Sequence, residues 1–258
     1  MKVVLLAGGK GTRMSEESKH RPKPMVEIGG MPIIWHIMKE YGYYGYNEFI
    51  VCGGYKQELI KQWFASYFTN YSDITFDFTS GNELIVHKKN VESWKVTIVD
   101  TGLETLTGGR VRRIRDYIGD ETFMLTYADG VCDVEIDKLV EFHKSHGKKA
   151  TITAVVRKQE KGVLEISDLG AVQSFREKRS MDGVPINAGY MVLEPSVFDY
   201  LSGDSSIFEI EALEKLSDEG ELMSYVHNGF WQCMDSIREK ELLEGLIEKN
   251  KAPWIRWN

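Results

Sequence analysis

The chain is poor in cysteine, with 3 cysteines in 258 residues, and no two of them form a Cys-x-x-Cys pair. The wide spacing of Cys52, Cys132 and Cys233 indicates neither a zinc site nor a disulfide framework. No apolar run approaches the roughly 20 residues of a membrane-spanning helix. The chain also lacks the basic, apolar and small-residue segments of a signal peptide. These absences predict a cytoplasmic protein without a membrane partner.

Positive charge is scarce as well. The 39 acidic residues outnumber the 32 lysines and arginines, so the formal net charge is −7. Because a nucleic-acid-binding protein usually carries a basic face, we expect no nucleic-acid partner. An acidic protein that binds a polyanion must gather its positive charge at one place, and four residues are candidates for that role: Arg13, Lys23, Arg110 and Lys178. The neighbouring Arg112, Arg113 and Arg115 are better explained as a solvated helix face.

Repeats, low-complexity tracts and Pro/Ser-rich linkers are also missing, which favours one domain over residues 1–258. Up to residue 149, apolar runs alternate with helical patterns, as in a parallel sheet. This half has expected strands at 2–6, 48–52, 74–78, 83–87, 95–99 and 122–127, and expected helices at 32–43, 57–68, 109–118 and 136–145. Residues 150–258 have expected strands at 151–156, 163–166, 171–175 and 189–193, and expected helices at 209–217 and 236–248. We therefore predict a Rossmann-like α/β fold, whose mixed, mainly parallel sheet is flanked by helices and gains antiparallel strands in the second half.

A glycine-rich loop follows the first predicted strand. The apolar run at 3–7 ends in three glycines, Gly8, Gly9 and Gly11. Without a Cβ, such residues let backbone N–H groups close on a polyphosphate. Lys10 is not followed by Ser or Thr, which excludes a Walker A loop, and the third glycine of a dinucleotide fingerprint is missing. An ordinary strand-to-helix turn would explain neither Arg13 nor the proline-flanked Lys23.

Two aspartates are candidate ligands for a divalent cation. Asp129 directly follows the predicted strand at 122–127, and ligands of open α/β sheets gather at the carboxyl ends of strands. Asp235 precedes the last predicted helix. Carboxylate oxygens together with substrate phosphates are the usual ligands of Mg²⁺. The alternatives are a turn aspartate at 129 and a helix cap at 235.

These motifs resemble the sugar nucleotidyltransferases, whose pattern is Gly-Gly-x-Gly-Thr-Arg followed by Pro-Lys-Pro-Met, as at 8–13 and 22–25 here. The resemblance implies that a sugar phosphate attacks the α-phosphorus of a nucleoside triphosphate, with Mg²⁺ as cofactor. It gives catalytic roles to Arg13 and Lys23, and metal binding to Asp129 and Asp235.

The resemblance also implies substrate-binding residues. The nucleotide half, 1–149, supplies Leu6, Gly8, Gly9, Gly11, Thr12, Thr107, Gly109, Arg110 and Tyr127. The sugar-phosphate half, 150–258, supplies Glu177, Lys178, Asn187 and Gly189. A turn at Gly108 and Gly109 is expected to expose main-chain donors and acceptors to a pyrimidine edge. By itself, the Glu177–Lys178 pair would be ordinary surface salt-bridge material.

Segments 107–110, 127–133 and 251–254 narrow the resemblance to family members that use CTP and glucose 1-phosphate. The expected partners are therefore CTP and a sugar 1-phosphate. Ala188 and Arg179 depart from the usual glycine and proline on the sugar side. A UTP- or dTTP-dependent enzyme, another sugar phosphate, and a non-catalytic regulatory protein that binds nucleotide sugars remain alternatives.

The chain ends in an aromatic tail, with Trp254, Ile255 and Trp257. Exposed aromatic side chains commonly mark contact surfaces, but the tail could equally fold back onto its own domain. The cytidylyltransferases that the chain resembles assemble as multimers, so we expect a homo-oligomer with closed symmetry.

Overall fold

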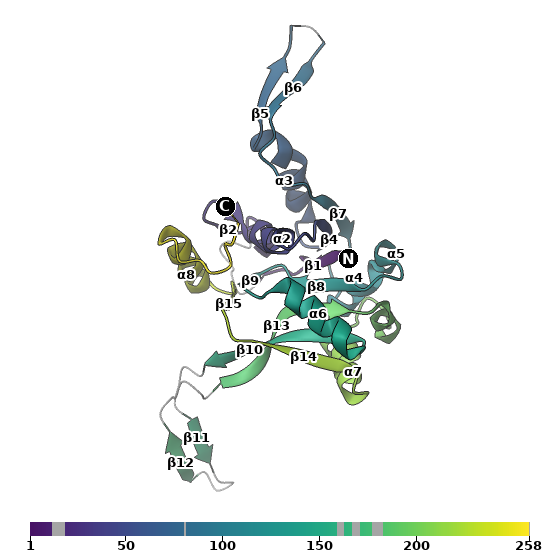
Figure 1. The fold of residues 1–258 in the computed structure, drawn as a ribbon, viewed down its shortest axis with the longest axis vertical. Coiled ribbons are helices and arrows are strands. Elements are labelled where there is room, and N and C mark those ends of the chain that lie inside the picture. Colours follow the sequence, from purple (N-terminus) through teal and green to yellow (C-terminus); the bar gives the residue numbers. More distant parts are fainter. Residues whose placement is uncertain (12–18, 80, 159–162, 167–170, 177–182, 258) are drawn as a thin grey trace.

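The computed structural model describes residues 1–11, 19–79, 81–158, 163–166, 171–176 and 183–257. Its centre is a seven-stranded sheet with strand order β14-β10-β13-β8-β1-β4-β7 (Figure 1). The strands are β1 (Val3–Leu6), β4 (Glu48–Gly53), β7 (Lys95–Asp100), β8 (Phe123–Tyr127), β10 (Ala150–Lys158), β13 (Gly183–Leu193) and β14 (Leu222–His227). Among the described strands of this sheet, β13 alone runs against its neighbours. The predicted mixed, mainly parallel sheet is confirmed, and β13 supplies an antiparallel strand of the second half.

Helices cover both faces of this sheet. They are α2 (Ile33–Tyr43), α3 (Gln57–Asn70), α4 (Thr107–Arg113), α5 (Arg115–Ile118), α6 (Ile136–His146), α7 (Lys215–Asp218) and α8 (Ile237–Glu248). Shorter turns are the 3-10 segments η2 (Lys23–Met25) and η3 (Pro195–Tyr200) and the π-helical η4 (Glu209–Glu214). None of the helices in the described part of the chain has the length and hydrophobicity that a bilayer crossing requires.

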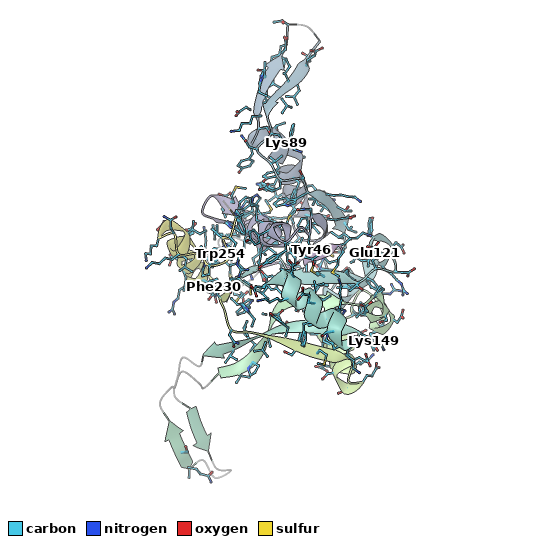
Figure 2. The ribbon with its side chains drawn as sticks, viewed as in Figure 1. Tyr46, Lys89, Glu121, Lys149, Phe230 and Trp254 are labelled. Atoms are coloured by element: carbon cyan, nitrogen blue, oxygen red, sulfur yellow. The ribbon has the colours of Figure 1, made fainter. Side chains whose placement is uncertain are left out.

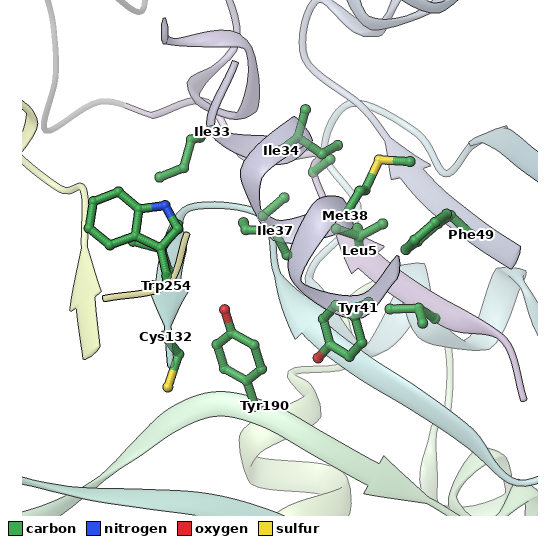
Figure 3. Packing of buried hydrophobic residues seen from close by; sticks show 14 of the residues in the cluster. Leu5, Ile33, Ile34, Ile37, Met38, Tyr41, Phe49, Cys132, Tyr190 and Trp254 are labelled. Atoms are coloured by element: carbon green, nitrogen blue, oxygen red, sulfur yellow. The ribbon is translucent and has the colours of Figure 1, made fainter. Parts of the chain in front are cut away.

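Two hydrophobic clusters lie on opposite faces of the sheet, because successive side chains of a strand point to opposite sides. Leu5 of β1 belongs to the first cluster, with Ile37 of α2 and Tyr190 of β13 (Figure 3). Val4 belongs to the second, with Val111 of α4. Burial on both faces explains why β1 is an unbroken apolar run.

In the described part of the chain, four two-stranded ribbons lie outside the main sheet. They are β2 (Glu27–Ile28) with β3 (Met31–Pro32), β5 (Asp73–Asp77) with β6 (Glu83–Lys88), β9 (Gly130–Cys132) with β15 (Trp231–Cys233), and β11 (Val163–Ile166) with β12 (Val172–Arg176). The ribbons β5–β6 and β11–β12 project from the body as two arms (Figure 1). The sequence predicted the strands of both arms, but not that they leave the sheet, and it missed β9, β14 and β15.

The aromatic tail folds back onto its own chain. Trp254 is completely buried and stacks on Phe230 with 5.4 Å between ring centroids (Figure 2). Trp257 packs edge-on against Trp35 of α2. The interpretation of the tail as an exposed contact surface is therefore wrong, so the tail gives no support to a homo-oligomer.

Candidate active site

A cavity of about 370 Å³ opens where β1 and β8 end. Ligands of open α/β sheets bind at this edge. Ten of the predicted site residues line it: Leu6, Gly8, Gly9, Gly11, Lys23, Thr107, Arg110, Tyr127, Asp129 and Asp235. The predicted Thr12, Arg13, Glu177 and Lys178 lie outside the described residues. The structure therefore brings these ten predicted residues together at one place.

Lys23 occupies the centre of the charged end of this cavity. The turn η2 begins at Lys23, and the buried Pro24 and Met25 anchor it in the core. Its Nζ lies 2.6 Å from Asp129 Oδ2 and 2.5 Å from Asp235 Oδ1. Burial lowers the pKa of Lys23, but the charges and hydrogen bonds of the two aspartates outweigh it, so the pKa lies above its ordinary value. The ammonium therefore stays charged between two carboxylates.

The ribbon β9–β15 explains how the two aspartates meet. Cys233 pairs with Gly130, and the N–H of Met234 donates to the carbonyl of Asp129 at 2.8 Å. The next residue after Met234 is Asp235, which this pairing places beside Asp129. Two chain segments about a hundred residues apart thus supply carboxylates to one position.

Ser236, and not Asp235, caps α8. The hydroxyl of Ser236 accepts a hydrogen bond from the N–H of Glu239 at 3.3 Å. In return the Glu239 carboxylate accepts one from the N–H of Asp235 at 2.7 Å. The pattern resembles a capping box, except that Glu239 accepts from the N–H of Asp235, the residue before the cap, rather than from that of Ser236. The helix-cap alternative for Asp235 is therefore wrong, and its carboxylate faces Lys23.

Arg110 forms part of the cavity wall and holds the loops behind it. It is 5% exposed, and its guanidinium donates to the carbonyls of Gly8 at 3.1 Å, Gly53 at 3.2 Å and Gly102 at 2.8 Å. These carbonyls follow or end β1, β4 and β7. A Cβ on Gly8 would lie 2.1 Å from Arg110 Nη1, so a side chain at this position would displace the buried guanidinium. Arg113 pairs with Asp204 at the surface, as the solvated-face interpretation predicted.

The interpretation of Gly108 and Gly109 as a turn with exposed backbone donors is wrong. Both N–H groups donate to the carbonyl of Ser206, at 2.9 and 3.2 Å. A Cβ on Gly109 would lie 2.5 Å from the carbonyl oxygen of Asp204. The two glycines therefore let the first turn of α4 pack against the chain at 204–206. Gly109 is not among the described residues that line the cavity.

Glu209, which the sequence analysis missed, joins two side chains of the cavity. Its Oε2 accepts a hydrogen bond from Thr107 Oγ1 at 2.7 Å, and its Oε1 accepts one from the hydroxyl of Tyr127. Glu209 begins the π-helical η4, and π-helical turns frequently occur at functional sites. In sequence it is one acidic residue among several in a predicted helix, so no local signal marks it.

The predicted sugar-side residues Asn187 and Gly189 shape a bulge in β13. The pairing with β10 jumps from Met191 to Asn187, and Asn187 Oδ1 accepts a hydrogen bond from the N–H of Gly189 at 2.8 Å. Gly189 has a φ of +84°, and a Cβ there would lie 2.4 Å from the ring of Tyr127. β-bulges often adjoin active sites because they redirect side chains. This bulge fixes the ring of Tyr127.

The fold and the cavity together define an α/β protein whose candidate site lies at the carboxyl ends of parallel strands. Residues 2–236 match the model of the nucleotidyl transferase family, and the chain belongs to that family.

Some curated relatives align with this chain over the full length of both sequences. The chain is 53% identical over 258 residues to glucose-1-phosphate cytidylyltransferase of Salmonella typhi. It is 44% identical over 258 residues to the probable glucose-1-phosphate cytidylyltransferase of Bacillus subtilis (strain 168). In the crystal structure of HddC from Yersinia pseudotuberculosis the fold recurs, with a TM-score of 0.68 over 95% of this chain and 99% of that one, at 24% identity.

Proposed function

We propose that the protein makes CDP-glucose and pyrophosphate from CTP and α-D-glucose 1-phosphate. The meeting of Lys23 with Asp129 and Asp235 beside the glycine loop carries this proposal. Identity of 53% with a glucose-1-phosphate cytidylyltransferase, over the full length of both chains, supports the choice of substrates.

The reaction needs charge neutralisation more than proton transfer. The second pKa of a sugar phosphate is about 6, so at pH 7 it is mostly dianionic and needs no general base. One of its oxygens forms a bond to the α-phosphorus of CTP. The bond from that phosphorus to the bridging oxygen breaks in line, and pyrophosphate leaves with the electron pair. Positioned cations and N–H donors stabilise the negative charge of this transition state.

The chain supplies these groups from separate elements. The backbone N–H groups of Gly8, Gly9 and Gly11 cradle the triphosphate. Lys23 stabilises charge on the transferred phosphate and the pyrophosphate, together with Arg13. On the sugar side, Glu177, Lys178 and Asn187 orient the sugar phosphate.

Asp129 and Asp235 would hold the Mg²⁺ ion. Their two oxygens approach one cationic nitrogen at 2.6 and 2.5 Å, which brings them close enough to share one small cation. Two carboxylates with substrate phosphates and waters suit Mg²⁺. When bound, the ion supplies charge neutralisation at the phosphates.

We also propose a homo-oligomer in the cytoplasm. The arm β5–β6 exposes Phe76 and Phe78 to 55% and 77%. A two-stranded ribbon is marginally stable alone, so this arm gains from a second subunit. All three cysteines are free thiols, which suits a reducing compartment. Light scattering after gel filtration tests the assembly, and a mass near 29.5 kDa at micromolar concentration would show a monomer.

A substrate panel tests the reaction. CTP, UTP and dTTP are each combined with glucose 1-phosphate and with other sugar 1-phosphates, and pyrophosphate release is measured with and without Mg²⁺. We expect the fastest release from CTP with glucose 1-phosphate, only with Mg²⁺. Faster release from UTP or dTTP would overturn the assignment of CTP as the nucleotide substrate. Release only with another sugar phosphate would overturn the assignment of glucose 1-phosphate, and no release at all would favour a regulatory protein.

A further inference from the structure

Glu209 stands behind the two hydroxyl groups of the cavity wall. Thr107 and Tyr127 line the cavity, and each gives its hydroxyl hydrogen to one oxygen of the Glu209 carboxylate. The three residues come from α4, β8 and η4, so only the tertiary fold brings them together. Leu6, Thr105 and Leu106 form the adjoining wall, and such apolar and small polar side chains suit the plane of a base.

The directions of these hydrogen bonds are fixed by chemistry. An ionised carboxylate only accepts hydrogen bonds. Thr107 Oγ1 also accepts a hydrogen bond from the N–H of Phe208 at 3.0 Å, so its own hydrogen goes to Glu209. Burial raises the pKa of Tyr127, and the Glu209 charge raises it further, so the phenol keeps its proton. A ligand in the cavity therefore meets only lone pairs on these two oxygens.

The two oxygens are also held in place. The ring of Tyr127 lies against Gly189, where a Cβ would approach it to 2.4 Å. Thr107 is fixed on its other side by the backbone of Phe208. Acceptors held in this way do not turn to suit a different ligand, which is the requirement for a discriminating site.

We propose that Glu209 is a positioning residue for base selection, because it holds Thr107 and Tyr127 as acceptors for a base that carries an amino group. This inference rests on the proposed function. Cytosine presents an N4 amino donor where uracil and thymine present a carbonyl oxygen. A carbonyl oxygen facing two fixed acceptors gains no hydrogen bond from either of them. The arrangement therefore favours CTP over UTP and dTTP.

Glu209→Gln tests the proposal with a change of nearly equal size. The amide accepts from one hydroxyl but donates to the other, so one hydroxyl reverses and can donate into the cavity. We expect the ratio of kcat/KM for CTP to kcat/KM for UTP to fall about tenfold, the scale of one hydrogen bond between neutral groups. Glu214→Gln is the matched control, because Glu214 lies exposed in the same η4. Its ratio should equal that of the wild type.

Equal losses with CTP and UTP in Glu209→Gln would show a merely structural role and overturn the inference. Tyr127→Phe is a second variant for the case that Glu209→Gln does not fold. It removes one acceptor and should also lower the ratio, whereas an unchanged ratio would overturn the inference.

Calorimetric binding of CTP and UTP, without sugar phosphate, separates this inference from the proposed function. A wild-type protein that binds UTP as tightly as CTP would overturn base selection. A binding ratio that shifts in Glu209→Gln, with no turnover of glucose 1-phosphate, would support base selection and overturn the proposed reaction.

Discussion

The cavity holds two groups of polar side chains in different ways. At the charged end, Lys23 lies between Asp129 and Asp235, whose side chains are 33% and 35% exposed. In the second group, the hydroxyls of Thr107 and Tyr127 share the carboxylate of Glu209. Partly exposed ion pairs exchange partners at little cost, whereas hydrogen bonds fixed by a third residue do not. The charged end can therefore change partners when phosphates arrive, whereas the two hydroxyls present one unchanging pattern.

Removing the ammonium at the charged end should have the largest effect. Lys23→Ala should lower turnover on the order of 100-fold or more, the scale for one preorganised group that stabilises transition-state charge. Steady-state pyrophosphate release measures it, and circular dichroism checks the fold. Lys95→Ala is the control, because Lys95 is exposed and pairs with Glu48 away from the cavity. A folded Lys23→Ala with near wild-type turnover would contradict the charged end as a catalytic centre.

Changes to the two carboxylates should have the next largest effect on turnover. Asp129→Asn and Asp235→Asn should each raise the Mg²⁺ concentration required for activity and lower turnover by about 10- to 100-fold. Mutation of a residue that only hydrogen-bonds to a metal ligand already has an effect of this size. Because both oxygens serve one ion, the double variant should lose less than the combined single losses. Titration of activity with Mg²⁺ measures this. Fully additive losses, or an unchanged Mg²⁺ titration in either variant, would show that the two residues do not bind the same ion.

Because the Lys23 ammonium and a metal ion would bind the same two carboxylates, removing the ammonium should increase the affinity for the metal. In the structure the ammonium of Lys23 occupies the place between the carboxylates. Lys23→Met removes this competitor, so Mg²⁺ should bind about two- to fivefold more tightly without nucleotide, the scale of a partly exposed ion pair. Titration calorimetry with Mg²⁺ alone measures it. Unchanged or weaker binding would show that the ammonium does not compete with the ion.

The cap of α8 should give the smallest effect on function. Ser236→Ala should lower the free energy of unfolding by about 1 kcal/mol. Turnover should change little, because the N–H of Asp235 still bonds to Glu239. Urea unfolding and turnover measure the two, with the exposed Ser145→Ala as control. A large loss of turnover would mean that the cap itself positions Asp235.

Elements with a strong local pattern could be predicted from the sequence. β1, β4, α2 and α6 appear within one residue of their predicted bounds, because apolar runs and helical periodicity are strong in buried elements. β14 is an edge strand of mixed polarity, and β9 and β15 have three residues each, so local sequence hardly marks them. The strands of both arms were predicted, but strand pairing between distant segments leaves no local signal.

The sequence by itself determined the chemical groups: a glycine loop after a buried strand, a lysine set between prolines, and an aspartate at a strand end. Only the tertiary structure decided which groups meet. It joins Lys23 to Asp129 and Asp235, which are 106 and 212 residues away in sequence. It also uses the N–H groups of Gly108 and Gly109 for packing and places Glu209 behind two hydroxyls. The reason is physical, since local sequence sets backbone preference, whereas contacts depend on long-range register such as that of β9 with β15.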